Sequence, residues 1–253
     1  MGLLKGKCAI VTGASSGIGQ AIADTFVREG ARVVGVDKNA DDVQHIANQD
    51  SATGASFDIV QADVGSPQAG HECVSSTLSS IGRLDILVNC AGIMRTAKII
   101  DLKLEDWLEV YRVNVQGTLL FSQAAAKAMI EQEDGGCILN MSSAAALKAD
   151  LKHAAYSSSK AAVLALTRVL ALELGEFGIR VNAILPGATK TPMLERVFAE
   201  VQGIERELIA RTLLGRIGSV QDQANAALFF ASDLASHITG EYLVVSGGEF
   251  LNP

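Results

Sequence analysis

Short runs of apolar and β-branched residues alternate along this chain with longer segments of helical periodicity. Runs such as Ile86-Leu87-Val88 are apolar on both faces, as parallel strands covered on both sides require. The alternation predicts a doubly wound α/β Rossmann fold, with a seven-stranded parallel sheet flanked by helices. The expected strands are Cys8–Thr12, Arg32–Asp37, Phe57–Ala62, Asp85–Asn89, Gly136–Met141, Arg180–Leu185 and Tyr242–Val245. The expected helices lie near 17–29, 40–49, 67–81, 104–131, 155–176 and 221–232.

No linker or break in composition interrupts the 253 residues, so the pattern predicts a single domain. The connection between Leu185 and the helix expected from Gln221 is unusually long, and it has a helical pattern of its own at Met193–Leu214. Long connections in compact domains frequently cover a binding site. We therefore expect residues 188–214 to form a lid over a substrate pocket.

The first expected strand ends in a glycine-rich turn, Thr12-Gly13-Ala14-Ser15-Ser16-Gly17-Ile18-Gly19. Glycines let a backbone approach a pyrophosphate closely, and the N-terminus of the following helix favours negative charge. The spacing G-x-x-x-G-x-G differs from the commoner G-x-G-x-x-G pattern. Taken alone, the turn is also compatible with an ordinary strand-to-helix connection.

An acidic residue ends the second expected strand, because Asp37 lies eighteen residues after Gly19. A carboxylate in this place accepts hydrogen bonds from the adenosine ribose and repels a 2′-phosphate. Position 16 is Ser16, so the glycine loop carries no basic side chain to pair with such a phosphate. Lys38 follows Asp37 directly. A lysine there weakens the preference for NAD over NADP if it reaches a 2′-phosphate, and has no effect if it is simply solvated. The pattern favours NAD over NADP.

Small and polar residues also follow the other expected strands: Asp63-Val64, Asn89-Cys90-Ala91-Gly92, Ser142-Ser143, and Pro186-Gly187 with Thr191 beyond. The carboxyl ends of parallel strands meet at one edge of a sheet, where ligands bind in such folds. Each of these turns is ordinary by itself. Their occurrence together, in this order, indicates one site along that edge.

Tyr156 and Lys160 lie four residues apart in an expected helix, and therefore on the same face. A phenol loses its proton near about pH 10, and a neighbouring ammonium lowers that pKa. The pair predicts a tyrosine that exchanges a proton near neutral pH. The spacing alone is equally compatible with an ordinary surface helix.

The composition argues against several classes of partner. A net charge of −7 disfavours nucleic acid and anionic membranes. The longest apolar runs are six residues, whereas a membrane-spanning helix needs about 20.

The four cysteines, far apart and without a C-x-x-C pair, predict buried thiols, no metal site and a reducing, cytoplasmic setting. These cysteines are Cys8, Cys73, Cys90 and Cys137.

Across essentially its full length, the chain resembles the short-chain dehydrogenase/reductase family. The matching residues are Thr12-Gly13-x-x-x-Gly17-x-Gly19, Asp63, Asn89-Cys90-Ala91-Gly92, Asn114, Ser143, Tyr156-x-x-x-Lys160, Pro186-Gly187 and Thr191. Any one of these motifs is weak, and their combination is highly specific. One departure is Cys90, where many members of the family have a second asparagine.

The resemblance implies a role for each of four catalytic residues. Tyr156 is the general acid/base, and Ser143 hydrogen-bonds the same substrate oxygen. Lys160 holds the nicotinamide ribose and lowers the pKa of Tyr156, and Asn114 anchors a water in a proton relay. The residues expected at the cofactor are Gly13, Ser15, Ser16, Gly17, Ile18, Gly19, Asp37, Asp63, Val64, Asn89, Ala91, Gly92, Tyr156, Lys160, Pro186, Gly187, Thr189 and Thr191.

The helix near 155–176 is apolar nearly all round, so one sheet cannot cover it and a second protein surface is expected. The resemblance implies a four-helix contact between two subunits, through this helix and the one near 104–131, usually within a homotetramer. The C-terminal tail Gly247–Pro253 is a candidate for reaching a neighbouring subunit.

Three functions are compatible with these residues. The leading one is an NAD-dependent oxidoreductase that interconverts a secondary alcohol, with polyols and sugar alcohols as candidate substrates, and its ketone. The first rival is an NADPH-dependent reductase of 3-oxoacyl thioesters on acyl carrier protein, against which Asp37 weighs. The second is a cofactor-sensing protein without catalysis, which the complete set of catalytic residues disfavours. His153 and Arg95 are open as substrate contacts, and solvated side chains are the alternative explanation of both.

Overall fold

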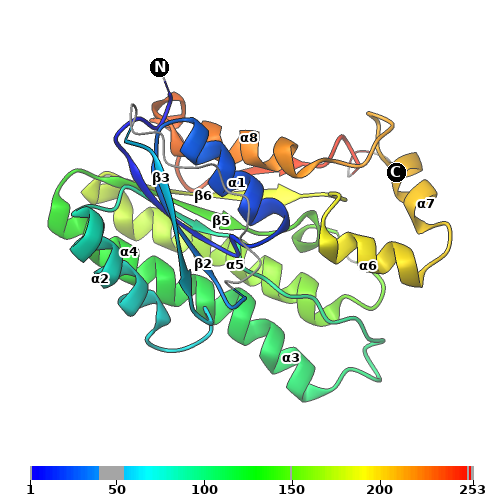
Figure 1. Cartoon of the computed structure of the whole chain (residues 1–253). Helices are drawn as coiled ribbons and strands as arrows, with labels where there is room; N and C mark the ends of the chain where they lie inside the picture. Colours follow the sequence, from blue (N-terminus) through cyan, green and yellow to red (C-terminus); the bar gives the residue numbers. More distant parts are fainter. Residues whose placement is uncertain (1, 40–53, 149, 250, 252–253) are drawn as a thin grey trace.

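The computed structural model describes residues 2–39, 54–148, 150–249 and 251 of the chain. The helix predicted near 40–49 lies outside the described residues. Seven parallel strands form one sheet in the order β3-β2-β1-β4-β5-β6-β7 (Figure 1). The order reverses direction between β1 and β4, as in a doubly wound fold. The predicted fold class is confirmed.

Each predicted strand is present, with its ends within one residue of those expected. The strands are β1 (Cys8–Thr12), β2 (Arg32–Asp37), β3 (Ser56–Gln61), β4 (Ile86–Asn89), β5 (Gly136–Met141), β6 (Ile179–Pro186) and β7 (Tyr242–Val245). The five residues of β1 and the four of β4 are all buried, because helices cover both faces of the sheet there.

Two helical layers enclose the sheet (Figure 1). One face carries α1 (Gly17–Arg28) and α8 (Val220–Ala231); the other carries α2 (Ala69–Ile81), α4 (Gly117–Gln132) and α5 (Ala154–Leu174). Neighbouring residues of β1 divide between the two cores: Val11 packs in the core with α1 and α8, and Ile10 in the core with α2, α4 and α5. Because successive side chains of a strand point to opposite faces of the sheet, one run of apolar residues contributes to both cores.

The helix predicted near 104–131 is interrupted in the structure. It consists of α3 (Leu104–Tyr111), a π-helical turn (Arg112–Gln116) and α4. A π turn takes one residue more than an α turn, and such turns are frequent at functional sites. Here the turn contains Asn114, whose side chain is buried and bonded to a neighbouring loop. The interruption therefore serves to point one amide inward.

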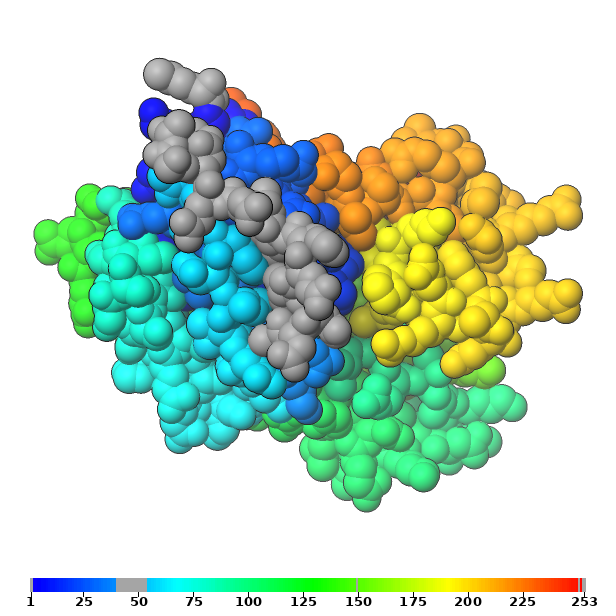
Figure 2. All heavy atoms as spheres, in the orientation of Figure 1, coloured from blue at the N-terminus to red at the C-terminus, as the bar shows by residue number. Residues whose placement is uncertain are grey.

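The long connection after β6 contains two helices, α6 (Pro192–Glu200) and α7 (Ile204–Arg211), instead of one helical run. Gly203, with φ of +81°, separates them in a left-handed conformation. All residues of α6 and α7 are described, and none of their side chains is buried. Figure 2 shows the segment as a surface lobe in yellow and light orange.

The C-terminal tail folds onto its own chain as far as it is described. The amide of Leu214, at the end of the α6–α7 segment, donates to the Gly247 carbonyl at 3.1 Å. The amide of Ala188, at its beginning, donates to the Glu249 carboxylate at 3.1 Å. Gly247–Glu249 therefore fasten both ends of the segment within the same chain, and the contact of the tail with a neighbouring subunit stays a prediction.

Two further observations concern the chain as a whole. Cys8, Cys73 and Cys137 are buried and Cys90 is partly buried, and all four are free thiols, as predicted. None of the helices in the described part of the chain has the length and apolar content that crossing a bilayer requires.

Candidate active site

Lys160 is buried at the carboxyl edge of the sheet, with 5% of its surface exposed. Its Nζ donates a hydrogen bond to the Met141 carbonyl, the last residue of β5, at 2.8 Å. A Cβ added at Gly92 would lie 3.2 Å from that Nζ and 3.3 Å from Oδ1 of Asn114. The fold thus brings together three predicted residues from β4, the π turn and α5.

Asn114 is fixed on all sides of its amide. Its Oδ1 accepts from the Ile93 amide at 2.8 Å, and its Nδ2 donates to the Ile93 carbonyl at 3.0 Å. The same Nδ2 donates to the Ser159 hydroxyl at 3.0 Å, and Thr118 donates to the Asn114 carbonyl at 2.8 Å. Ser159, next to Lys160, had no signal in the sequence beyond its place between Tyr156 and Lys160.

Tyr156 lies in the first turns of α5, beside Ser143, which follows β5. The two hydroxyls hydrogen-bond to each other. The Ser143 hydroxyl also accepts from the Ala145 amide at 3.1 Å and so caps a short helical turn. This backbone bond fixes the serine oxygen beside the phenol.

The predicted lowering of the Tyr156 pKa is wrong for this structure. Burial raises the pKa of Tyr156, and the hydrogen bond with Ser143 offsets only part of that effect. The Lys160 ammonium lies 5.8 Å from the phenol ring centroid and is bonded to Met141, not to the phenol. Burial also lowers the pKa of Lys160 to about 8.

Close backbone approaches explain the glycines of the first turn. A Cβ at Gly13 would lie 2.9 Å from backbone atoms of Ala91, and one at Gly19 would lie 2.1 Å from the Gly13 carbonyl oxygen. Thr12 secures the first approach, because its hydroxyl accepts from the amides of Cys90 and Ala91 at 3.0 and 3.1 Å. Any residue with a side chain would push the two loops apart.

The glycine loop also meets the beginning of the α6–α7 segment. Gly17, with φ of +57°, has the Thr191 side chain 3.5 Å from the position of an added Cβ. Thr191 caps α6, since its hydroxyl accepts from the Leu194 amide at 3.3 Å. Ser16 and Ile18 flank Gly17 at the start of α1. Four predicted cofactor residues are therefore contiguous in space.

Asp37 faces the glycine loop from the end of β2. Its Oδ2 accepts from the Ser15 amide and its Oδ1 from the Asn39 amide, both at 3.1 Å. A carboxylate has about four lone-pair directions, so two amides leave room for hydroxyl donors. The predicted partners Ser15 and Asp37 are adjacent in the structure.

Asp63 is held by a bidentate pair with Arg112, at 3.1 and 2.9 Å, and by the Gly65 amide at 3.0 Å. These bonds hold the pKa of Asp63 below its usual range, with the Arg112 hydrogen bond as the main cause. Arg112 also binds Glu109 in α3. The side chain of the neighbouring Val64 is buried against α4, so only its backbone is left for a ligand.

The side chain of Asn89 turns into the protein. Its Nδ2 donates to the Ser122 hydroxyl at 3.0 Å and to Oδ1 of Asn140 at 2.9 Å. Asn140 in turn donates to Thr167 in α5 at 3.0 Å. This buried network ties β4, β5, α4 and α5 together, and it leaves the backbone of Asn89 alone at the site.

The end of β6 is shaped by backbone and hydroxyl contacts. Gly187, after Pro186, has its added Cβ position 2.5 Å from Ser246, so the position admits no side chain. Thr189 is buried, donates to the Gly187 carbonyl at 3.0 Å and accepts from Gln223 at 3.1 Å. Its hydroxyl is therefore engaged within the protein.

His153 and Arg95 lie at the mouth of this site. His153 immediately precedes α5, and its ring centroid is 6.2 Å from that of Tyr156. Arg95 follows β4 and lies 3.8 Å from the Asp106 carboxylate. Asp106 begins α3, which supplies Arg95 with a partner inside the chain.

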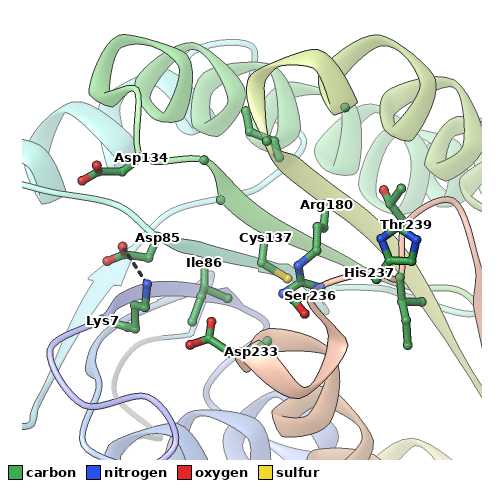
Figure 3. Close-up of a pocket in the computed structure, with 17 residues that line it drawn as sticks. Lys7, Asp85, Ile86, Asp134, Cys137, Arg180, Asp233, Ser236, His237 and Thr239 are labelled. Atoms are coloured by element: carbon green, nitrogen blue, oxygen red, sulfur yellow. Dashed lines mark ion pairs between the residues drawn. The ribbon is translucent and has the colours of Figure 1, made fainter.

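A separate cavity of about 590 Å³ lies at the opposite, amino-terminal edge of the sheet (Figure 3). Its lining includes the first residues of β4, β5 and β6: Ile86, Gly136 and Ile179. Lys7 and Asp85 form an ion pair there at 3.8 Å. The cavity contains none of the residues predicted for the cofactor or for catalysis, so we place the candidate active site at the carboxyl edge, where those residues meet.

Comparison with known proteins gives similarity over nearly the whole chain. The family model "Enoyl-(Acyl carrier protein) reductase" matches residues 13–249. The 7alpha-hydroxysteroid dehydrogenase of Escherichia coli (strain K12) is 41% identical over 245 residues, 97% of this chain and 94% of that protein. The D-threitol dehydrogenase of Mycolicibacterium smegmatis is 41% identical over 248 residues, 97% of this chain and 93% of that protein.

A solved structure of 7 alpha-hydroxysteroid dehydrogenase, complexed with NADH and 7-oxo glycochenodeoxycholic acid, shares the fold with a TM-score of 0.91. It is 40% identical, covering 97% of this chain and 94% of that one. The chain belongs to the short-chain dehydrogenase/reductase family. It is an oxidoreductase of that family.

The residues of this short-chain dehydrogenase/reductase fit a nicotinamide dinucleotide. At Gly13 and Gly19 a Cβ would fill the cradle where the backbone lies closest. Within the described structure, the Ser16 side chain makes no capping bond at the start of α1, and the first turn contains no acidic residue. The first amides of α1 therefore remain available to an anion, as a pyrophosphate requires.

Gly92→Ala tests the packing around Lys160. Its φ lies outside the left-handed region, so the substitution adds only a methyl group, 3.2 Å from Nζ and 3.3 Å from Asn114. We expect the displaced ammonium to lower kcat/KM about tenfold with little change in the melting temperature. The matched control is Gly175→Ala, where nothing lies within 4 Å. Equal activity of the two variants would show that the position of Lys160 is not critical.

Proposed function

We propose that this short-chain dehydrogenase/reductase interconverts a secondary alcohol and its ketone by hydride transfer, with NAD as the cofactor and a polyol or sugar alcohol as the substrate. The observation that carries the proposal is the phenol of Tyr156, bonded to Ser143 and beside the Lys160 ammonium. D-threitol is a polyol, and the relative named for it is 41% identical.

In the proposed reaction, Ser143 donates a hydrogen bond to the substrate oxygen and orients it at the phenol. Tyr156 exchanges a proton with that oxygen, and its raised pKa keeps the phenol protonated, as the proton donor in ketone reduction must be. The nicotinamide supplies or accepts the hydride. Gly13, Gly17, Gly19 and Asp37 would hold the adenosine and pyrophosphate half of the cofactor.

Tyr156→Phe tests the acid/base role. The variant removes one oxygen from a partly buried ring, so we expect kcat to fall by about a thousandfold or more while the affinity for NAD, measured by fluorescence titration, changes little. Retention of most of the wild-type kcat would show that Tyr156 is not the proton donor. A parallel loss of NAD affinity would mean that the substitution disturbs the cofactor site instead.

Asp37 supports NAD over NADP, because its carboxylate lies beside the glycine loop and would repel a 2′-phosphate. We expect kcat/KM of the wild type to be higher with NAD than with NADP, and Asp37→Ser to reduce that ratio about tenfold. Asp58→Ser, on the exposed side of the edge strand β3, is the control. A wild-type preference for NADP(H) would favour the rival 3-oxoacyl thioester reductase.

The outer face of α5 supports the proposed homotetramer. Ala161, Ala165, Val169 and Leu172 form an exposed apolar stripe at helical spacing, and Leu172 is 85% exposed. A second copy of this face would bury the stripe.

We expect Leu172→Glu to dissociate the assembly, because it places a charge at the centre of the proposed contact. Light scattering should then give a mass near that of one chain, 26.5 kDa, where the wild type gives a multiple of it. A wild type that is monomeric at micromolar concentration would disprove the assembly.

We propose that residues 188–214 act as the substrate lid. The segment begins beside the glycine loop at Gly17 and Thr191, and its two helices bury no side chain, as a closing element requires. Unchanged hydrogen exchange in α6 and α7 after addition of NAD and an alcohol would contradict this role.

A further inference from the structure

The His153 ring lies beside the Tyr156 ring. The two ring planes meet at 64°, edge to face, with centroids 6.2 Å apart. The histidine side chain is 27% exposed, and Tyr156, like His153, is partly buried. The imidazole therefore lies next to the reacting phenol and is partly accessible to a ligand.

The backbone holds His153 in place from both directions. The Ala97 amide donates to the Lys152 carbonyl at 3.0 Å, which ties the loop after β4 to the loop before α5. The His153 carbonyl accepts from the Ser157 amide at 2.7 Å, in the first turn of α5. Lys152 has φ of +66°, a costly left-handed conformation outside glycine that such contacts must maintain. The ring is thus presented by a rigid frame.

The hydrogen bonding of His153 is incomplete. Its Nδ1 is buried and has no hydrogen-bond partner among the described residues, and the Asp150 carboxylate lies 4.0 Å away. A carboxylate on that side favours the tautomer with the proton on Nδ1, which leaves Nε2 as an acceptor. With the Nδ1 proton directed at the Asp150 carboxylate, Nε2 is the ring atom left to accept a hydrogen bond from a ligand.

The chemistry of this arrangement selects a hydroxyl over an anion. Nε2 as an acceptor matches an O–H donor, and the Asp150 carboxylate behind the ring disfavours a negatively charged substrate group. We propose that His153 binds a second substrate hydroxyl, on the carbon next to the reacting one, so that the enzyme is selective for vicinal diols and polyols. The inference rests on the proposed function and specifies the substrate class of that same site.

Matched pairs of alcohols test the inference. The substrates are cis-1,2-cyclohexanediol with cyclohexanol, and 2,3-butanediol with 2-butanol, each oxidised with NAD by the full-length enzyme. The variants are His153→Phe, which removes the hydrogen bond, and His153→Asn, which restores a short polar group. His71→Phe, on the exposed surface of α2, is the control for the substitution itself.

We expect the wild type to oxidise the diols with kcat/KM about tenfold above their mono-alcohol partners. His153→Phe should lower kcat/KM for the diols to that of the mono-alcohols, and it should leave kcat/KM for the mono-alcohols within about threefold of the wild type. His153→Asn should restore part of the preference for diols. His71→Phe should match the wild type.

Two results would overturn the inference, and they are distinguishable from each other. If the wild type oxidises mono-alcohols and diols equally, or if His153→Phe lowers both classes by the same factor, His153 has only a structural role and the proposed dehydrogenase function stands. If the wild type oxidises neither class with NAD or NADP, the proposed function fails together with the inference.

Discussion

The structure of the site depends on one buried charge. The ammonium of Lys160 enters the protein along α5 and donates to the last carbonyl of β5, at 2.8 Å. An ammonium loses much of its hydration on burial, which is why its pKa falls to about 8. The fold compensates by placing an oxygen of Met141 at the charge and by keeping Gly92 without a side chain beside it. The arrangement of the loop after β4 and of α5 around Lys160 follows from the burial of this ammonium.

The π turn and the glycine contacts also shape the surroundings of the buried Lys160 ammonium. The extra residue in the turn points Asn114 towards Ile93 and Ser159, which fixes the loop after β4 against α5. Gly13 then allows the loop after β1 to lie against the loop after β4. The loop after β4 thus contacts both the glycine loop, the candidate dinucleotide site, and α5, which carries the candidate proton donor Tyr156. The helices α6 and α7, in the segment that the tail fastens at both ends, bury no side chain.

The strands of this chain were predictable from its sequence, whereas several side-chain contacts were not. Strand ends were predictable within one residue, because the β-branched and apolar runs are bounded by turn residues, such as Gly13 after β1 and Ser142 after β5. The interruption of the helix at Arg112–Gln116 was not, since a π turn has no periodic signature of its own. The inward turn of Asn89 and the pairing of Asp63 with Arg112 also escaped prediction, because both depend on partners distant in the chain.

The sequence by itself determined the order of strands and helices, and it predicted the edge of the sheet at which the candidate site residues meet. These follow from local periodicity and from turn chemistry, which the neighbouring residues decide. The tertiary structure alone decided the direction in which the pKa of Tyr156 shifts: it is raised, because burial outweighs the hydrogen bond with Ser143. It also decided that His153 stands beside the phenol with unused hydrogen-bonding capacity. Desolvation and distance are properties of the packed chain, and no spacing in the sequence encodes them.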